Sequence, residues 1–352
     1  MAAQTIAIAG AGVLGRLLAW TLARAGHHVQ VVDPAPGPEP RHDGQGAAGF
    51  TAAGMLSPLA ESENAGPEIG ALGWRALGRW QDIAAALDQP GGEPALVRRA
   101  GSLLLAHPGD RGAAQRVLAR LAEAAPHGQP TPRALAAGEL AALEPALAPN
   151  LLGWSLDGEG QLLSPAMMHA LCRAAPQVQW HWGRRALRVE PGRLLLDDGQ
   201  VLAADWAIDA RGLGAKDVLP LRGVRGEVLW LHAPGVVLAR PLRLLHPRHR
   251  VYLVPRPGDL IVVGATEVES EDRSPVSLAS AVELLTAAHS VIPALAEARI
   301  VHLETNLRPA LPDHRPVVEH EAGLLRINGL FRHGWLLAPA LVDDALHQLE
   351  LA

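Results

Sequence analysis

The fold of this chain is decided by residues 5–15, which read TIAIAGAGVLG. Their first part, Thr5–Ala9, is a short apolar run of the kind found in buried parallel strands. The run leads into a G-x-G-x-x-G turn, and leucines then recur at helical spacing up to Leu22. A second apolar run follows and ends at Asp33. This order of strand, glycine turn, helix, strand and acid predicts a Rossmann-type α/β unit.

The three glycines of the turn have separate tasks. Gly10 allows the tight turn, Gly12 lets the backbone approach a pyrophosphate, and Gly15 lets the helix pack closely on the strand. Free N–H groups at the start of the helix favour the pyrophosphate, and Asp33 can accept hydrogen bonds from an adenosine ribose. The segment therefore predicts a dinucleotide site. It does not by itself choose between NAD and FAD.

Length and composition limit the remaining possibilities. The chain has 352 residues, of which 49% are hydrophobic, so we expect about two domains with a substantial core. With 31 Lys and Arg against 36 Asp and Glu, the net charge of −5 argues against a protein that coats nucleic acid. No apolar run is long enough to span a membrane, and the N-terminus lacks a secretory signal. We therefore expect a soluble, cytoplasmic protein without an integral membrane segment.

Hydrophobic periodicity extends the α/β pattern along the chain. Residues 34–49 are rich in Pro and Gly and predict a loop. Helices are expected over residues 69–87, 111–124, 164–174, 281–289 and about 338–349, with another turn at residues 136–143. Strands are expected over residues 178–182, 186–189, 193–196, 206–210, 224–231, 251–254, 260–265 and 324–328. The pattern predicts a Rossmann core that the chain leaves and re-enters, with a strand-rich domain inserted.

Six further segments carry a family likeness. They are residues 52–64 (AAGMLSPLAESEN), 221–227 (LRGVRGE), 252–256 (YLVPR), 262–266 (VVGAT), 307–313 (LRPALPD) and 328–339 (NGLFRHGWLLAP). In this order they resemble the flavin-facing and substrate-facing segments of the FAD-dependent glycine oxidases of bacterial thiamine biosynthesis. These enzymes belong to the broader D-amino-acid oxidase family, and the likeness covers nearly the whole chain.

This resemblance implies a fold, a cofactor and a reaction. The fold is a Rossmann-type FAD-binding domain of residues 1–85, 152–222 and 304–352, with an inserted substrate domain of residues 86–151 and 223–303. The cofactor is noncovalent FAD. The reaction is the oxidation of glycine, sarcosine or a small D-amino acid to the imine, with dioxygen as acceptor and hydrogen peroxide as product. The imine would then supply the thiazole ring of thiamine.

The resemblance also implies which residues hold the substrate. A substrate carboxylate needs fixed positive charge, and the planar fork of an arginine matches it with two hydrogen bonds. The candidates are Arg308 and Arg332, with the hydroxyl of Tyr252, the only tyrosine of the chain, as a third donor. Met55 and Glu267 are expected at the substrate pocket. Glu267 stands where glycine oxidases often carry Met, and it either contacts a substrate amine or, as surface acids usually do, points to solvent.

A larger set of residues is expected to contact the cofactor. Gly329 and Gly334 allow close approach of the backbone to a planar ring, and the helix expected from about Ala338 would direct its positive N-terminal end at the reduced flavin. The expected cofactor contacts are Gly10, Gly12, Val13, Leu14, Gly15, Asp33, Ala53, Gly54, Met55, Ala186, Gly212, Gly329, Arg332, His333, Gly334, Trp335 and Leu336.

Other chemistry has less support in the sequence. His27, His28, His246 and His249 have no carboxylate or thiolate at ligand spacing, so no metal site is predicted. The single cysteine, Cys172, lies in a helical pattern and is expected to be a small buried apolar residue. Two alternative functions stay open. One is a D-amino-acid dehydrogenase that passes electrons to a quinone or a carrier, and the other is a flavin-binding protein without turnover. A homo-oligomer is possible.

Overall fold

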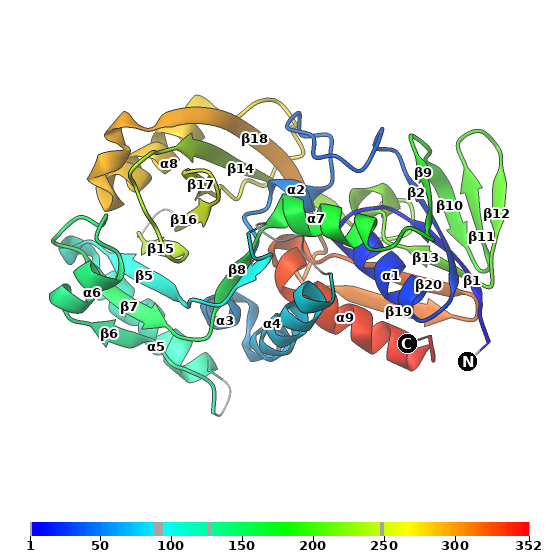
Figure 1. Cartoon of the computed structure of the whole chain (residues 1–352), viewed down its shortest axis with the longest axis horizontal. Coiled ribbons are helices and arrows are strands. Elements are labelled where there is room, and N and C mark those ends of the chain that lie inside the picture. The colour runs from blue at the N-terminus through cyan, green and yellow to red at the C-terminus, as the bar shows by residue number, and fades with distance from the viewer. Residues whose placement is uncertain (1, 88–93, 126–127, 247–249, 352) are drawn as a thin grey trace.

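The computed structural model describes residues 2–87, 94–125, 128–246 and 250–351. His249, considered above as a metal ligand, lies outside these residues. Two groups of strands lie side by side (Figure 1), one containing β1 near the two chain termini and the other containing the long strands β14 and β18. Helices α3 and α4 and strand β8 lie between the two groups in this view. The α/β fold predicted from the sequence is confirmed.

The first group is a six-stranded sheet centred on β1. Its order is β19-β20-β13-β1-β2-β9, and the neighbours from β20 to β9 are parallel while β19 is antiparallel to β20. All residues of β1 after Thr5 are buried, as expected for a strand covered on both faces. The strands are β1 (Thr5–Ala9), β2 (His28–Asp33), β9 (Gln179–Trp182), β13 (Trp206–Asp209), β19 (Val317–Glu321) and β20 (Leu324–Asn328).

The glycine turn has the geometry that its sequence predicts. Gly10 has a φ of +101°, and a Cβ atom there would lie 2.5 Å from the carbonyl oxygen of Ala210. A Cβ on Gly15 would lie 1.8 Å from the carbonyl oxygen of Gly10, so only glycine lets helix α1 (Val13–Arg24) approach the turn. The first and third glycines are thus required by packing alone.

The second group contains an eight-stranded mixed sheet. Its order is β18-β14-β17-β16-β15-β5-β7-β6, and β14 and β18 pair along their whole length. Strand β18 runs across the predicted domain boundary at residues 303 and 304, and β7 joins this sheet although it follows the predicted boundary at 151. The strands are β5 (Ser102–Ala106), β6 (Arg133–Leu135), β7 (Leu152–Leu156), β14 (Arg222–His232), β15 (Leu242–Leu245), β16 (Arg250–Arg256), β17 (Leu260–Gly264) and β18 (Arg299–Ala310).

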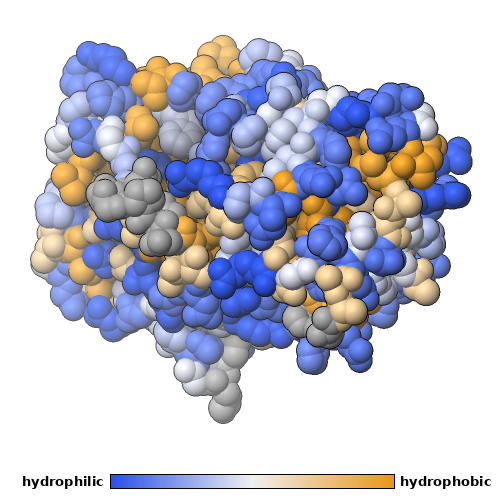
Figure 2. Space-filling model, turned by 45° about the vertical axis from the view of Figure 1, so that its right-hand side comes forward, coloured by the Kyte–Doolittle hydropathy of each residue, from blue (hydrophilic) through white to orange (hydrophobic). Residues whose placement is uncertain are grey.

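Two small sheets and the helices complete the architecture. The small sheets are β3 (Met55–Leu56), β8 (Gly160–Leu162) and β4 (Val97–Arg98), and β10 (Ala186–Glu190), β11 (Arg193–Leu196) and β12 (Val201–Ala203). The remaining α-helices are α2 (Ala48–Thr51), α3 (Pro58–Ala65), α4 (Pro67–Ala86), α5 (Arg111–Ala124), α6 (Ala137–Leu143), α7 (Ser164–Arg173), α8 (Leu278–Val291) and α9 (Gly334–Gln348). Among the described residues, none of the helices is long and apolar enough to cross a membrane. The face in Figure 2 is mostly hydrophilic, with apolar side chains in separate patches.

Helix α9 begins at Gly334, so the predicted start near Ala338 is wrong. The helix passes through Pro339, which has no N–H to donate to the carbonyl of Trp335 four residues earlier. The indole Nε1 of Trp80, on helix α4, donates to this carbonyl oxygen instead, at 2.6 Å. Because a side chain replaces the missing donor, the proline is accommodated inside the helix.

This replacement predicts a measurable loss on removing the indole donor. Trp80→Phe leaves the buried carbonyl of Trp335 unpaired, which costs about 1–3 kcal/mol beyond the loss of packing. Trp20→Phe is the matched control, because the Nε1 atom of Trp20 is buried without a hydrogen-bond partner in the described part of the chain. Urea unfolding followed by far-UV circular dichroism measures both. Equal losses of unfolding free energy in the two variants would contradict the role of Trp80.

Candidate active site

One large cavity lies between the glycine turn and the eight-stranded sheet. Its volume is about 1830 Å³, and its walls include Gly10 and Asp33 from the first sheet and Tyr252 and Arg308 from the second. Typical small-molecule pockets have volumes of roughly 300–1,000 Å³. The cavity therefore has room for a dinucleotide together with a small second molecule.

Most of the predicted site residues line this cavity. All three predicted catalytic residues and both predicted substrate-pocket residues are in its walls. Gly15 and Gly329 are not: Gly15 packs helix α1 on the turn, and Gly329, with a φ of +74°, forms the turn after β20 against Leu311. The predicted cofactor residues that line it are Gly10, Gly12, Val13, Leu14, Asp33, Ala53, Gly54, Met55, Ala186, Gly212, Arg332, His333, Gly334, Trp335 and Leu336.

The glycine turn is held in a shape that suits a pyrophosphate. The peptide N–H of Ala11 donates to Oδ2 of Asp33 at 2.6 Å, and the Ala11 carbonyl accepts from Nε of Arg16 at 2.8 Å. A Cβ on Gly12 would come no closer than 3.9 Å to another residue, so the space in front of this residue is open. These observations fit a nucleotide phosphate at the start of helix α1.

A second wall of the cavity is built by residues 52–55. The buried Arg256 of β16 donates to the carbonyl oxygen of Ala53 and, at 3.0 Å, to Oε1 of Gln161. Ser164 donates to the carbonyl oxygen of Ala52 at 2.6 Å. Burial lowers the pKa of Arg256 to about 10, so the group stays charged at neutral pH. These hydrogen bonds hold the backbone that leads into Gly54 and Met55. The sequence did not reveal this role of Arg256.

Arg308 differs in its partners from Arg243 and Arg332, which both pair with Glu61. Its Nη1 donates to the carbonyl oxygen of Arg225 at 3.3 Å and its Nη2 to that of Thr266 at 3.0 Å. Within the described residues, no carboxylate lies within ion-pair distance of Arg308. Burial lowers the pKa of its guanidinium, which nevertheless remains positively charged at neutral pH. The charge is available to an anion in the cavity.

Two glycines make room for the groups around Arg308. A Cβ on Gly226 would lie 2.4 Å from Nη2 of Arg308, so the guanidinium rests against bare backbone of β14. A Cβ on Gly264 would lie 2.8 Å from the hydroxyl oxygen of Tyr252, its cross-strand neighbour. Burial raises the pKa of Tyr252, so its hydroxyl keeps its proton and can donate.

Arg332 is neutralised by acidic residues from two other segments. Its Nη2 lies 3.0 Å from Oε2 of Glu61 on helix α3, and its Nη1 lies 3.3 Å from Oε2 of Glu267. Glu61 also accepts from Arg243 at 2.8 Å. Burial alone would raise the pKa of Glu61, but Arg243, Arg332 and His333 hold it well below its ordinary value. Glu61 and Arg243 were not predicted as site residues, and only the position of Glu61 in the segment 52–64 pointed to it.

His333 lies directly before helix α9 and is 3% exposed. Burial lowers its pKa from 6.5 to about 4, although Glu61 opposes the shift. His333 is therefore neutral at pH 7 and adds no charge of its own beside the positive end of the α9 dipole. Burial also raises the pKa of the Cys172 thiol to about 11, which argues against a nucleophilic thiolate there.

Comparison with known proteins shows the family. The model for FAD-dependent oxidoreductases of the D-amino-acid oxidase type matches residues 5–343. This chain belongs to that family. The oxidoreductase is 37% identical to a putative thiamine biosynthesis oxidoreductase, ThiO, of Rhizobium etli, over 98% of this chain and 96% of the relative. It is 28% identical to a glycine oxidase of Geobacillus kaustophilus over 99% of this chain and 94% of the relative.

Solved structures agree with the sequence comparison. The crystal structure of the Geobacillus kaustophilus glycine oxidase matches with a TM-score of 0.82 and 25% identity over 99% of this chain and 95% of that one. An iminodiacetate oxidase from Chelativorans sp. BNC1 matches with a TM-score of 0.80 and 26% identity over 98% and 95% of the two chains. The predictions of the family, the fold and FAD as the cofactor of the oxidoreductase are confirmed.

The lowered pKa of His333 predicts a pH-dependent contribution to stability. As the pH falls, His333 becomes protonated in the unfolded chain before it does so in the folded chain. Its contribution to the unfolding free energy is therefore complete above pH 6.5 and is lost as the pH falls towards 4. Between pH 7 and pH 5, the unfolding free energy of the parent should fall by about 1–2 kcal/mol more than that of His333→Gln. Urea unfolding with a constant excess of FAD measures this difference.

Replacement of the exposed His28 by Gln controls for the loss of a histidine from the surface. The His28→Gln variant should follow the parent over the same pH range. A His333→Gln variant that loses as much stability as the parent would show that His333 does not titrate in this way.

Proposed function

We propose that the oxidoreductase oxidises glycine, or a similar small amino acid, to the imine with reduction of dioxygen to hydrogen peroxide. The observation that carries the proposal is Arg308, a cavity-lining guanidinium whose partners in the described structure are carbonyl oxygens. A monocarboxylate supplies the missing negative charge and matches the fork of the guanidinium. The ThiO and glycine oxidase relatives support glycine as the substrate.

The cofactor site is proposed on the walls described above. The glycine turn and Asp33 would hold the nucleotide part of FAD, and residues 53–55 and 333–336 would hold the ring system. Bound FAD supplies the two-electron oxidation chemistry, and the protein supplies orientation and charge. The N-terminus of α9, next to neutral His333, presents free N–H groups and a positive dipole end to negative charge in the cavity.

Tyr252 and Arg332 complete the proposed substrate site in different roles. The protonated hydroxyl of Tyr252 donates a hydrogen bond to the carboxylate held by Arg308. Arg332 is bound to Glu61 and Glu267 and so has less positive charge to offer a substrate. We propose that its ion pairs fix one wall of the pocket, with Met55 as an apolar part of the lining.

The function is tested by mixing the purified, yellow holoenzyme with glycine in the absence of oxygen. We expect the flavin absorbance to be lost, and hydrogen peroxide to form once air is admitted. Arg308→Ala removes a charge-assisted contact, so kcat/KM should fall by about 30- to several-thousand-fold, while FAD content stays unchanged. Arg308→Lys should restore little, because an ammonium group cannot form the fork.

Three outcomes would contradict parts of this proposal. A colourless protein would contradict FAD binding. Reduction of a quinone analogue without peroxide formation would favour the dehydrogenase alternative. Near-parental reduction rates in Arg308→Ala at low glycine would place the substrate carboxylate elsewhere, with Arg332 as the next candidate.

Glu267 is proposed to tune substrate choice. Its side chain is 47% exposed and pairs with Arg332, so it lies at the wall of the pocket and not wholly in solvent. Glu267→Met frees one side of Arg332 and removes a negative charge, which should disfavour cationic amines and change the relative rates for glycine, sarcosine and D-alanine several-fold. Steady-state peroxide assays measure the ranking. An unchanged ranking would place Glu267 outside the substrate pocket.

Several finer predictions stay predictions. These are the supply of the imine to thiamine biosynthesis, a cytoplasmic location, a homo-oligomer and the division into residues 1–85, 152–222 and 304–352 for FAD and 86–151 and 223–303 for the substrate. The first is supported by the name of the Rhizobium etli relative.

A further inference from the structure

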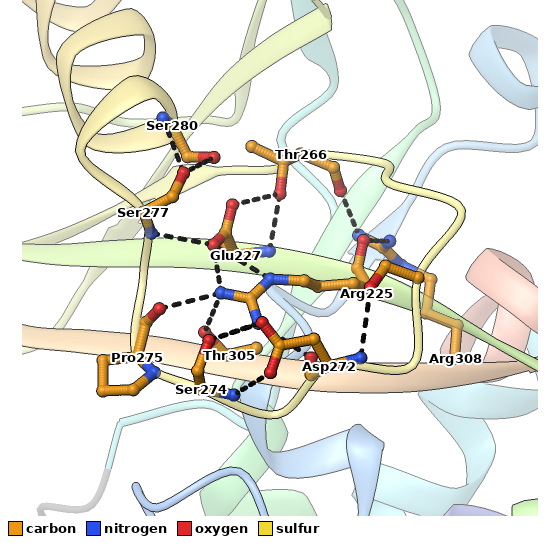
Figure 3. A network of polar contacts seen from close by, with 11 residues as sticks. Arg225, Glu227, Thr266, Asp272, Ser274, Pro275, Ser277, Ser280, Thr305 and Arg308 are labelled. Carbon is orange, nitrogen blue, oxygen red and sulfur yellow. Dashed lines mark hydrogen bonds and ion pairs between the residues drawn. The ribbon is translucent and has the colours of Figure 1, made fainter.

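A buried carboxylate lies behind the wall that holds Arg308. Glu227 is on strand β14 and is 1% exposed, and it does not line the cavity. Figure 3 shows Glu227 between Thr266 and Ser277, with Arg225 beside it and Arg308 further along the same network. A buried charge of this kind is costly unless hydrogen bonds and an opposite charge satisfy it.

Glu227 is fully satisfied by groups from two segments, its own strand β14 and the residues between β17 and α8. Its Oε1 accepts from Nη2 of Arg225 at 2.6 Å and from the N–H of Ser277 at 3.0 Å. Its Oε2 accepts from the hydroxyl of Thr266 at 3.0 Å. Burial would raise the pKa of Glu227, but hydrogen bonds from Ser280, Arg225, Ser277 and Thr266 lower it, so the carboxylate is ionised at neutral pH.

These contacts fasten both ends of one loop. Residues 265–277 connect β17 to helix α8 and contain no helix or longer strand. Glu227 holds Thr266 at the start of this loop and Ser277 at its end. Arg225 holds the middle, because its guanidinium donates to the carbonyl oxygens of Asp272 at 2.7 Å and Pro275 at 2.8 Å.

The same residues provide the two carbonyl groups that orient Arg308. Arg308 donates to the carbonyl oxygens of Arg225 and Thr266. The side chain of Arg225 is bound to Glu227, and Thr266 is bound to Glu227 through its hydroxyl and also through its N–H, which donates to the Glu227 carbonyl at 3.3 Å. Glu227 is therefore the residue that connects both supports of the Arg308 fork.

We propose that Glu227 is a positioning residue for substrate binding, which sets the direction of the Arg308 guanidinium through Arg225 and Thr266 and holds the loop that carries Glu267. This inference rests on the proposed role of Arg308 as the carboxylate anchor. Glu227 makes no contact with substrate or cofactor. Its effect is on the geometry of binding, where a displacement of about 1 Å can cost on the order of a hundredfold in activity.

The test compares acetate binding and glycine turnover in four holoenzymes: the parent, Glu227→Gln, Arg308→Ala and the double variant. Acetate binding is measured from the change in the flavin spectrum, which needs no turnover. Glu227→Gln should raise the Kd of acetate and the KM of glycine roughly ten- to hundredfold, while the flavin reduction rate at saturating glycine stays within about threefold. In the Arg308→Ala background, Glu227→Gln should raise the Kd of acetate and the KM of glycine little further, because Glu227 acts through the guanidinium of Arg308.

A matched control separates positioning from general stability. Glu144 is also 1% exposed and is paired with an arginine, Arg240, at 3.0 Å, but it is away from the cavity. Glu144→Gln should leave the Kd of acetate and the KM of glycine at parental values. Thr266→Val keeps the side-chain volume but removes both hydrogen bonds between the Thr266 hydroxyl and Glu227, one to Oε2 and one from the Glu227 N–H. It therefore tests the same role if Glu227→Gln does not fold. It should raise both constants several-fold.

The outcomes distinguish this inference from the function it rests on. Loss of acetate binding in Arg308→Ala with parental binding in Glu227→Gln, or in Thr266→Val if that variant has to replace it, overturns the role of Glu227 alone. The role of Glu227 is also overturned if Glu227→Gln weakens acetate binding by the same factor in the parent and in the Arg308→Ala background. Parental acetate binding in Arg308→Ala overturns both the inference and the proposed anchor.

Discussion

The site depends on a positive charge that the protein orients but does not neutralise. Arg308 projects from β18 against the bare backbone at Gly226, and two carbonyl dipoles fix its fork. Carbonyl dipoles compensate a guanidinium only in part, and burial makes the remaining charge costly. A carboxylate that enters the cavity supplies the missing charge with matching geometry. The preference that we propose, for a small substrate with a carboxylate, follows from this uncompensated charge.

The two sheets contribute different residues to the walls of the cavity that contains this charge. The first sheet contributes the glycine turn, whose Gly10 and Gly15 positions exclude any side chain. The second sheet contributes Arg308 from β18 and Tyr252 from β16, with β14 and β17 between these two strands. Arg332 comes from the segment before α9 and is already neutralised by Glu61 and Glu267. We therefore propose that Arg308 and Arg332 differ in function, because Arg332 has carboxylate partners and Arg308 has carbonyl partners.

Much of the fold was predictable because the decisive signals are local. The turn at residues 10–15, the helix Arg111–Ala124 and the strand Leu324–Asn328 follow from short-range patterns, and the structure confirms them. Strand β18 was not predicted, because its first five residues are all exposed and show no alternation. The start of α9 was placed too late, because the donor that accommodates Pro339 comes from Trp80, far away in the sequence. The same limit applies to the site, since the pairing of Glu61 with Arg332 and the support of Ala53 by Arg256 exist only after folding.

We propose that Arg308, and not Arg332, holds the substrate carboxylate. A crystal structure of the FAD-loaded enzyme with acetate decides between the two arginines. We expect acetate with both oxygens on the guanidinium of Arg308 and one of them also on the hydroxyl of Tyr252, with the Arg332 pairs to Glu61 and Glu267 intact. Acetate bound to Arg332, with either of those ion pairs broken, would contradict it.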